Sequence, residues 1–250
     1  MGHIAVFDSG VGGISVLREL KKLMPEEDFL YFGDSANAPY GGKSTQAVRQ
    51  LCLDRAKQLI TPETKALVVA CNTATAAAID ILRKTYPGNI IIGIEPALKV
   101  AAERFPNGKI GIMATEVTLR EEKLAVLQTR FPGSVVYRIP APGLVELIEA
   151  GKAESAEATA LLKDILAPYV GKLDALVLGC THYPFVKDAI GGILGDATVL
   201  LDGGAGTARQ TRRCLENAGL LGGGTGKIVF QNSLNSPEIL SLCEKLLGFV

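Results

Sequence analysis

The chain has 250 residues, of which 48% are hydrophobic and 21% are charged, a composition typical of a globular protein and not of a disordered one. Its 26 basic and 26 acidic residues cancel, so no basic field is present that would attract nucleic acid. The longest apolar stretches have the length of strands, short of the roughly 18–20 residues that a membrane helix needs, and no signal-peptide pattern precedes the first strand, so we expect a soluble, cytoplasmic protein without membrane contact.

Strand-like and helix-like runs alternate along the whole chain. The predicted strands are Ile4–Phe7, Phe29–Phe32, Ala66–Ala70, Ile90–Ile94, Ile110–Met113, Val135–Arg138, Ala175–Leu178, Thr198–Leu201 and Lys227–Phe230. The predicted helices are Ile14–Leu23, Thr45–Ile60, Ala74–Lys84, Ala97–Arg104, Leu119–Phe131, Gly143–Ala150, Ser155–Val170, Phe185–Leu194, Thr207–Ala218 and Pro237–Leu247. Such alternation favours an α/β fold with mainly parallel sheets that are covered by helices.

The order of elements repeats within the chain. Ile4–Phe7 opens one block and Ile110–Met113 opens the other, and each block reaches a strand that ends in a cysteine after a similar number of residues. Parallel α/β sheets bind ligands at the carboxyl ends of their strands. We therefore expect two pseudo-symmetric α/β domains, with Cys71 and Cys180 on opposite walls of an active site in the interdomain cleft.

The five cysteines fall into two groups. Cys52, Cys214 and Cys243 lie on apolar helical stripes and are expected to fill the core, because a free cysteine behaves as a small hydrophobe. Cys71 and Cys180 each end a strand instead. The chain contains no Cys-x-x-Cys pair, so it predicts neither a zinc ribbon nor a thioredoxin-like site, and no metal is expected.

Two glycine-rich stretches resemble anion-binding loops only weakly. Asp8–Gly13 follows the first strand, but a dinucleotide fingerprint would need glycine or alanine where Ser15 stands. Gly222–Lys227 imitates a phosphate loop, yet Leu221 and Ile228 occupy two of its defining positions. We interpret this second stretch as a flexible turn.

The segment Gly33–Gly42 follows the second predicted strand and carries polar groups. Asp34 is either a turn or cap residue or a residue of the site, and the pattern leaves both interpretations open. Tyr40 and Gly41 offer a hydroxyl group and an accessible backbone N–H to a small ligand.

The first strand-end cysteine, Cys71, precedes a helix that is rich in alanine. A helix N-terminus stabilises a thiolate and so lowers the pKa of a thiol. Asn72 and Thr73 place an amide and a hydroxyl beside the sulfur, and Asp8, at a neighbouring strand end, is a candidate proton partner for it.

The second strand-end cysteine, Cys180, has the same format. Thr181 and His182 follow it, and Pro184 suits the first turn of a helix. A lone histidine is usually structural, but one that lies two residues after a strand-end cysteine is a plausible thiol partner.

Two equivalent thiols suit proton transfer on both faces of one carbon atom. A racemase that moves a proton without a cofactor needs a base on one face of the reacting carbon and an acid on the other. The two groups must be alike because the reaction runs in both directions, and a thiol with a pKa near ~8.5 can take either role.

Six segments, in this order, resemble the glutamate racemases of the aspartate/glutamate racemase family: IAVFDSGVGGISVL, YFGDSANAPYGGKS, VVACNTATA, IGIEPA, IGIMATEVT and VLGCTHYPF. The resemblance implies two α/β domains, the first over residues 1–94 and 206–250 and the second over residues 95–205. It also implies a cofactor-independent isomerase that interconverts L-glutamate and D-glutamate and supplies D-glutamate for peptidoglycan, hence for cell-wall biogenesis and cell shape.

The resemblance also implies roles for individual residues. Cys71 would take the proton from D-glutamate and Cys180 from L-glutamate, with Asp8 and His182 tuning the nearer thiol. The residues implied to bind substrate are Asp8, Ser9, Tyr40, Gly41, Asn72, Thr73, Thr181 and His182. Those with possible auxiliary roles are Asp34, Thr115, Thr118 and Glu149.

The chain departs from the family pattern at two places. Asn37 stands where arginine is frequent, and Ala141-Pro142 stands where a Cys-Pro pair is frequent. A racemase for aspartate or hydantoins, and an amino-acid binding protein without activity, are the alternatives. His182 favours glutamate over aspartate as the substrate. The family implies a small-molecule substrate, no nucleic acid and a homodimer.

Overall fold

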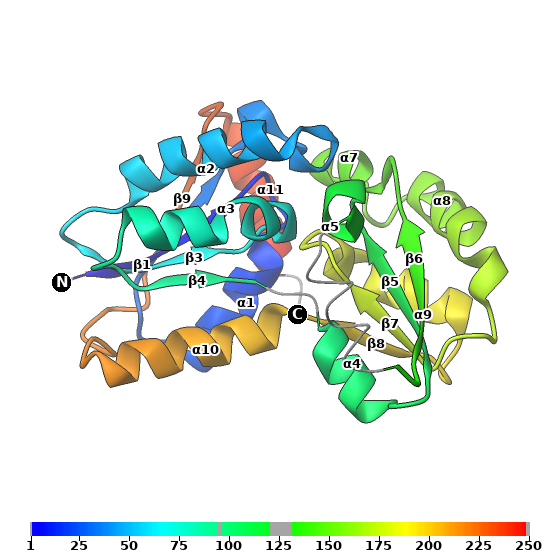
Figure 1. The fold of residues 1–250 in the computed structure, drawn as a ribbon. Coiled ribbons are helices and arrows are strands. Elements are labelled where there is room, and N and C mark those ends of the chain that lie inside the picture. The colour runs from blue at the N-terminus through cyan, green and yellow to red at the C-terminus, as the bar shows by residue number, and fades with distance from the viewer. Residues whose placement is uncertain (1, 95–96, 121–131, 249–250) are drawn as a thin grey trace. The chain divides into compact units, whose positions relative to one another are not determined.

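The computed structural model describes residues 2–94, 97–120 and 132–248 (Figure 1). Contacts between residues divide the chain into two units, Met1–Glu95 with Gly204–Val250, and Pro96–Gly203. Each unit holds a parallel sheet with helices against it, so the predicted α/β class is confirmed. Of the helix predicted over residues 119–131, the part from residue 121 lies outside the described residues.

The sheet of the first unit has five parallel strands in the order β4-β3-β1-β2-β9. The strands are β1 (His3–Asp8), β2 (Phe29–Gly33), β3 (Thr64–Val69), β4 (Ile91–Gly93) and β9 (Ile228–Asn232). The central strand β1 pairs on both sides and is buried from its second residue onward, which explains its continuous apolar run. Phe7 pairs with Val69 and Asp8 pairs with Gly33, so the carboxyl ends of β1, β2 and β3 are level with one another.

Helices cover both faces of this sheet. They are α1 (Ile14–Leu23), α2 (Thr45–Leu59), α3 (Asn72–Thr85), α10 (Gly204–Asn217) and α11 (Pro237–Leu247), with 3-10 turns over Ser35–Asn37 and Tyr40–Gly42. Figure 1 shows α2 and α3 on one face and α1 and α10 on the other. Ala5, Phe7 and Leu67 belong to one apolar cluster with buried side chains of α2 and α3. The last part of the chain therefore returns to the first unit and adds both an edge strand and two helices to it.

The sheet of the second unit has four parallel strands in the order β6-β5-β7-β8. These are β5 (Lys109–Ala114), β6 (Val135–Pro140), β7 (Ala175–Leu178) and β8 (Val199–Asp202). The helices are α4 (Leu98–Arg104), α5 (Glu116–Arg120), α7 (Leu144–Glu149), α8 (Ala156–Leu166) and α9 (Lys187–Leu194), with 3-10 turns over Ala167–Tyr169 and Tyr183–Val186. One apolar cluster joins the sheet to α7, α8 and α9, and a second joins it to α4 and to Leu119 of α5.

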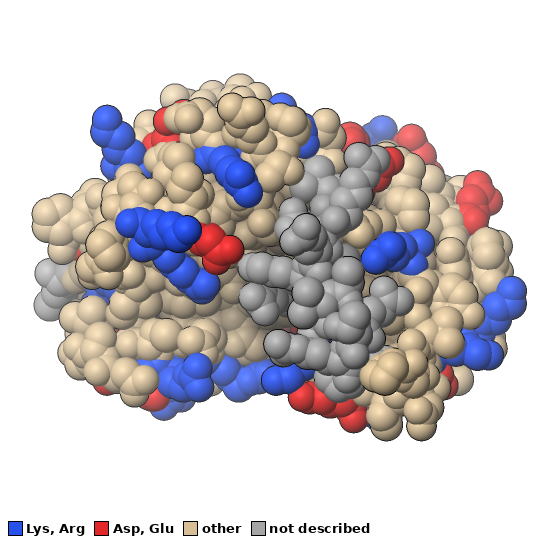
Figure 2. Space-filling model, viewed as in Figure 1, with Lys and Arg blue, Asp and Glu red and all other residues tan. Residues whose placement is uncertain are grey.

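Charged side chains do not gather into one field on the face shown in Figure 2. Lys, Arg, Asp and Glu side chains are dispersed there among uncharged ones, in keeping with the balanced composition. Within the described residues, no helix is both long enough and apolar enough to cross a bilayer.

Candidate active site

Backbone hydrogen bonds align the strand ends of the first unit. The Asp34 N–H donates to the Asp8 carbonyl at 2.9 Å, and the Ala70 N–H donates to the Phe7 carbonyl at 2.8 Å. The residues that follow β1, β2 and β3 therefore lie along one edge of the sheet. This edge is where parallel α/β sheets bind ligands.

Cys71 occupies the N-cap position of α3 at this edge. Its sulfur accepts a hydrogen bond from the Ala74 N–H at 3.4 Å and lies 3.6 Å from Ser9 Oγ, and the side chain is almost fully buried. An amide donor and the positive end of a helix dipole both favour the thiolate over the thiol. The prediction that Cys71 begins a helix is confirmed, whereas its contact with Ser9 was not predicted from the sequence.

Three other predicted site residues are buried at the same edge of the sheet. Asp8 Oδ1 accepts from the Gly10 N–H at 2.9 Å, and Thr73 is in the first turn of α3. Asn72 Oδ1 is buried, and no described residue donates a hydrogen bond to it. A buried carbonyl oxygen without a donor is unfavourable, so this atom is poised to accept a hydrogen bond from a ligand.

A close approach of α1 to β1 fixes the conformation of the turn that carries Asp8 and Ser9. A Cβ atom added to Gly13 would lie only 2.6 Å from Asp8 Cβ and 3.1 Å from Ala70 Cβ. The glycine at this position allows the helix to begin directly beside the strand ends.

Asp34 and Tyr40 form a buried pair at the end of β2. Tyr40 Oη donates to Asp34 Oδ2 at 2.7 Å, and Asn37 Nδ2 donates to both carboxylate oxygens, at 3.1 and 3.2 Å. Burial raises the pKa of Tyr40 far above its ordinary value, and the hydrogen bond and the negative charge of Asp34 add to that increase. Asp34 thus precedes a 3-10 turn without capping it through its side chain, and its carboxylate holds Tyr40. Gly41 follows within the next 3-10 turn.

In the second unit, Cys180 lies at the corresponding strand end. The Gly179 N–H donates to the Met113 carbonyl at 2.8 Å, which ties the segment after β7 to the end of β5. Cys180 is followed by a 3-10 turn over Tyr183–Val186, with Pro184 inside it, and only then by α9. The expectation that Cys180 begins an α-helix in the way Cys71 does is therefore wrong, because the 3-10 turn comes first.

Cys180 has a different partner from Cys71. Its sulfur lies 3.5 Å from His182 Nδ1, and His182 Nε2 lies 2.5 Å from Glu149 Oε1 at the end of α7. Burial lowers the pKa of His182, but the contacts with Cys180 and Glu149 outweigh burial and hold the pKa well above its ordinary value. A thiol, an imidazole and a carboxylate thus form one chain, in which the carboxylate orients the ring and favours the imidazolium.

The remaining predicted residues of this unit also lie near the carboxyl edge of its sheet. Thr115 follows β5, and its hydroxyl donates to Thr118 Oγ1 at 3.1 Å while accepting from the Thr118 N–H at 3.4 Å. Thr118 and Thr181 are both buried. The structure therefore brings Cys180, His182 and Glu149 into one cluster, with Thr181 between the first two in the chain and with Thr115 and Thr118 after the neighbouring strand β5.

The other cysteines differ from these two. Cys52 and Cys243 are buried, and Cys214 is half-buried and accepts a hydrogen bond from Gln210 Nε2 at 3.2 Å. Burial raises the pKa of the Cys52 thiol, with smaller contributions from the charges of Cys71 and Asp34. A thiol of this kind stays protonated and fits a packing role.

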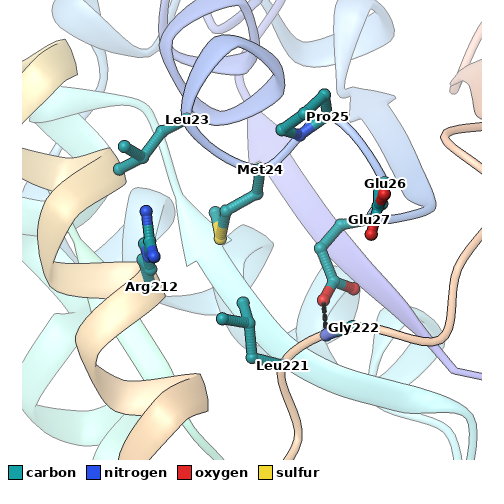
Figure 3. A pocket seen from close by; sticks show the side chains of 8 residues that line it. All are labelled: Leu23, Met24, Pro25, Glu26, Glu27, Arg212, Leu221 and Gly222. Atoms are coloured by element: carbon teal, nitrogen blue, oxygen red, sulfur yellow. Dashed lines mark hydrogen bonds between the residues drawn. The ribbon is translucent and has the colours of Figure 1, made fainter.

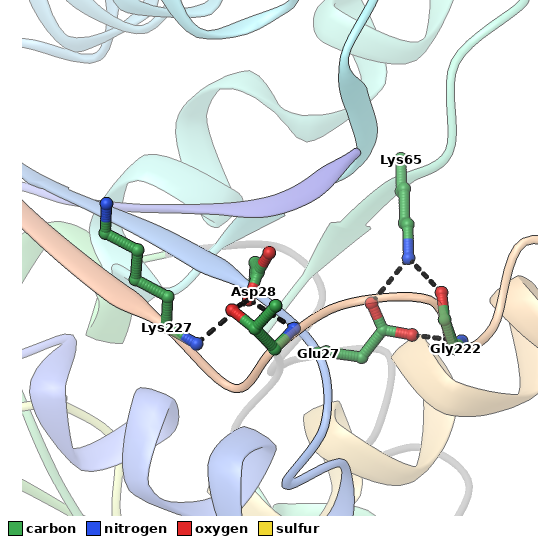
Figure 4. Close-up of polar contacts among 6 residues, drawn as sticks. Glu27, Asp28, Lys65, Gly222 and Lys227 are labelled. Atoms are coloured by element: carbon green, nitrogen blue, oxygen red, sulfur yellow. Dashed lines mark hydrogen bonds and ion pairs between the residues drawn. The ribbon is translucent and has the colours of Figure 1, made fainter. Parts of the chain in front are cut away.

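The Gly222–Lys227 stretch, which we expected to be a flexible turn, makes hydrogen bonds with Glu27, Asp28 and Lys65. Lys65 Nζ donates to Glu27 Oε2 at 2.7 Å and to the Gly222 carbonyl at 2.6 Å, and the Gly222 N–H donates to Glu27 Oε1 (Figure 4). Asp28 Oδ1 accepts from the Lys227 N–H at 2.9 Å. Lys65 lies near the start of β3 and its partners lie before β2 and β9, so these contacts are at the sheet edge opposite Cys71.

A cavity of about 250 Å³ lies at the same opposite edge. It is lined by Leu23, Met24, Pro25, Glu26, Glu27, Arg212, Leu221 and Gly222 (Figure 3). None of the predicted site residues lines it. Within residues 2–94, 97–120 and 132–248, no group of three or more His, Cys, Asp or Glu side chains is placed to hold a metal ion.

Known proteins resemble this chain over nearly its whole length. The family model for Asp/Glu/Hydantoin racemase matches residues 13–211. A glutamate racemase from Clostridium novyi is 47% identical over 99% of this chain and 97% of its own length. The crystal structure of the Francisella tularensis glutamate racemase in complex with D-glutamate is similar at a TM-score of 0.84 and 30% identity, covering 98% of this chain and 93% of that one. The Escherichia coli glutamate racemase in complex with L-glutamate and the activator UDP-MurNAc-ala is similar at a TM-score of 0.85 and 30% identity, covering 98% and 95%.

Proposed function

The chain belongs to the Asp/Glu/hydantoin racemase family and is a racemase, and from that premise we propose that it interconverts L-glutamate and D-glutamate by a two-base proton transfer at Cα. The choice of glutamate rests on the similarity to proteins with that activity across the two units of the chain. The reaction needs no cofactor in this proposal, because two cysteine thiols supply both the base and the acid.

One observation carries the proposal. Each sheet presents a buried thiol at the carboxyl end of a central strand, Cys71 after β3 and Cys180 after β7, and each thiol has its own polar partner. A reversible proton transfer through a planar carbanion needs a base on one face of the carbon and an acid on the other, and two thiols can exchange these roles between the two directions. A protein that only bound an amino acid would have no need of two such thiols.

The proton balance is simple. In the L-to-D direction the Cys180 thiolate removes the α-proton, and the Cys71 thiol donates its own proton to the opposite face of the same carbon. In the D-to-L direction the two thiols exchange roles. Each turnover leaves the enzyme with the ionisation state that the reverse reaction needs, so no external acid or base is consumed.

The two thiols have different neighbours. The helix N-terminus and the Ala74 N–H lie beside the Cys71 sulfur, whereas His182, held by Glu149, lies beside the Cys180 sulfur. Asp8 is proposed to tune Cys71 from the adjacent strand end. Different neighbours for Cys71 and Cys180 suit racemisation, because L-glutamate and D-glutamate present different groups to the two thiols.

The proposed substrate-binding groups lie at or shortly after the same strand ends. The uncompensated Asn72 Oδ1 accepts from the substrate ammonium, and the N–H groups of the first turn of α3 suit a carboxylate. Ser9, Tyr40, Gly41, Thr73 and Thr181 complete the set, with Asp34, Thr115 and Thr118 in support. We further propose a cytoplasmic homodimer whose product, D-glutamate, is used for peptidoglycan.

The direct test follows the purified protein with either enantiomer of glutamate and of aspartate, by chiral chromatography. We expect both glutamate enantiomers to reach a racemic mixture while aspartate stays unchanged. If the protein racemised aspartate or a hydantoin but not glutamate, that compound would be its substrate in place of glutamate. If the protein bound glutamate without racemising it, the alternative of an amino-acid binding protein without activity would be supported instead.

A further inference from the structure

The turn after β9 is organised around one buried side chain, that of Asn232. Asn232 Oδ1 accepts from the Leu234 N–H at 3.0 Å and from the Ser236 N–H at 3.1 Å, while its Nδ2 donates to the Ser236 carbonyl at 3.1 Å. Asn232 is itself buried. The side-chain amide of Asn232 thus accepts through its oxygen and donates through its nitrogen, and both kinds of bond close the turn between β9 and α11.

From this turn, Ser233 reaches the end of β2 by two hydrogen bonds. Its N–H donates to the Gly33 carbonyl at 3.0 Å, and its hydroxyl oxygen accepts from the Ala36 N–H at 2.9 Å. The two bonds enclose Asp34 and Ser35 between them. The hydroxyl is the only part of this clamp that depends on the side chain at position 233.

The enclosed segment carries one side of the candidate active site. The Asp34 N–H is fixed to the Asp8 carbonyl at 2.9 Å, and the fully buried Asp34 carboxylate holds Tyr40 Oη at 2.7 Å. The Asn37 N–H in turn donates to the Asp34 carbonyl at 2.9 Å. Any loosening at Ala36 is therefore transmitted to Asp34, and from there to Tyr40 and Gly41.

We propose that Ser233 is a positioning residue, whose hydroxyl sets the Asp34–Gly41 segment in the geometry that binds substrate. This inference rests on the proposed function for the substrate and the kinetic readout, whereas the ordering of the segment is independent of it. It assigns a role in the site to the last part of the chain, which returns to the first unit after the second unit is complete. Because Ala36 is exposed, water can replace a lost acceptor, so the effect should be moderate.

The experiment compares Ser233→Thr with Ser233→Val, two side chains of nearly equal shape of which only threonine keeps the hydroxyl. Ser236→Ala is the matched control, because Ser236 lies in the same turn but its hydroxyl caps α11. We expect Ser233→Val to raise KM for both glutamate enantiomers about three- to tenfold with kcat within about twofold. Ser233→Thr should stay within about twofold of the parent protein, and Ser236→Ala should lower stability without changing KM.

A second readout does not depend on the reaction. Hydrogen exchange without substrate should be faster in the Ser233→Val variant across residues 34–41 and unchanged in β1. Unchanged exchange across residues 34–41, or faster exchange with an unchanged KM, would overturn the role of Ser233. If the parent protein racemises no glutamate, the proposed function fails, and the exchange data still decide whether Ser233 orders the segment.

Discussion

Replacing Glu149 by glutamine tests the chain of contacts behind Cys180. The substitution keeps the shape of the side chain and removes a negative charge that lies 2.5 Å from His182 Nε2, where the His182 and Glu149 side chains are only 3% and 18% exposed. A hydrogen bond to a charged group contributes roughly 1.5–3 kcal/mol, and each 1.4 kcal/mol is about tenfold in rate. We therefore expect kcat/KM to fall about 10- to 150-fold.

Both directions of the reaction should lose the same factor. The enantiomers have equal free energies in water, so the equilibrium constant is one and kcat/KM must stay equal for L-glutamate and D-glutamate. The pKa of His182 should fall, because the charge of Glu149 is one of the causes that raise it. The alkaline limb of the pH profile of kcat/KM should consequently move to lower pH, where the imidazolium is now lost.

Glu146→Gln is the control for this variant. Glu146 is an exposed residue of the same helix and undergoes the same chemical change. Its pH profile should match that of the parent protein. A Glu149→Gln variant with less than about threefold loss and an unshifted alkaline limb would refute the reasoning.

Two further predictions concern stability. Tyr40→Phe removes a hydroxyl that donates to the buried Asp34 carboxylate, so urea denaturation should show a loss of about 1–3 kcal/mol; a variant as stable as the parent would mean that the carboxylate finds another donor. The raised pKa of His182 stabilises the folded state most fully below the unfolded pKa of about 6.5, and this contribution is lost as the pH rises through the folded value. Thermal midpoints should therefore fall less between neutral and alkaline pH in a His182→Asn variant than in the parent, and equal slopes would contradict the assignment.

The strands were predictable because each is a short buried run that the sequence marks clearly. β1, β3 and β7 are apolar on both faces, as strands in the middle of parallel sheets must be, and the periodicity of α2 shows which side packs. The segment after Cys180 was less predictable. Pro184 suits the first turn of an α-helix and of a 3-10 helix equally, so residue preferences could not separate the two.

The candidate site residues stand out in the sequence, but not all of their contacts do. Cys71 and Cys180 stand out because each interrupts the pattern at the end of a strand. The contacts of Ser9 with Cys71 and of Glu149 with His182 join residues 62 and 33 positions apart, and they depend on how the elements pack. The support that Ser233 gives to Ala36 spans 197 positions, and neither periodicity nor a motif indicates such a contact.

Deuterium incorporation at Cα in heavy water, measured by NMR for Cys71→Ser and Cys180→Ser with each enantiomer of glutamate, tests the central claim most directly. General acid–base groups contribute about 100- to 10,000-fold, so racemisation should fall by at least that factor in both variants. The thiol that remains should exchange only its own enantiomer: L-glutamate in Cys71→Ser and D-glutamate in Cys180→Ser, each with retained configuration. A single variant that still racemises glutamate at the parent rate, or exchanges both enantiomers equally, would contradict a mechanism with one thiol on each face.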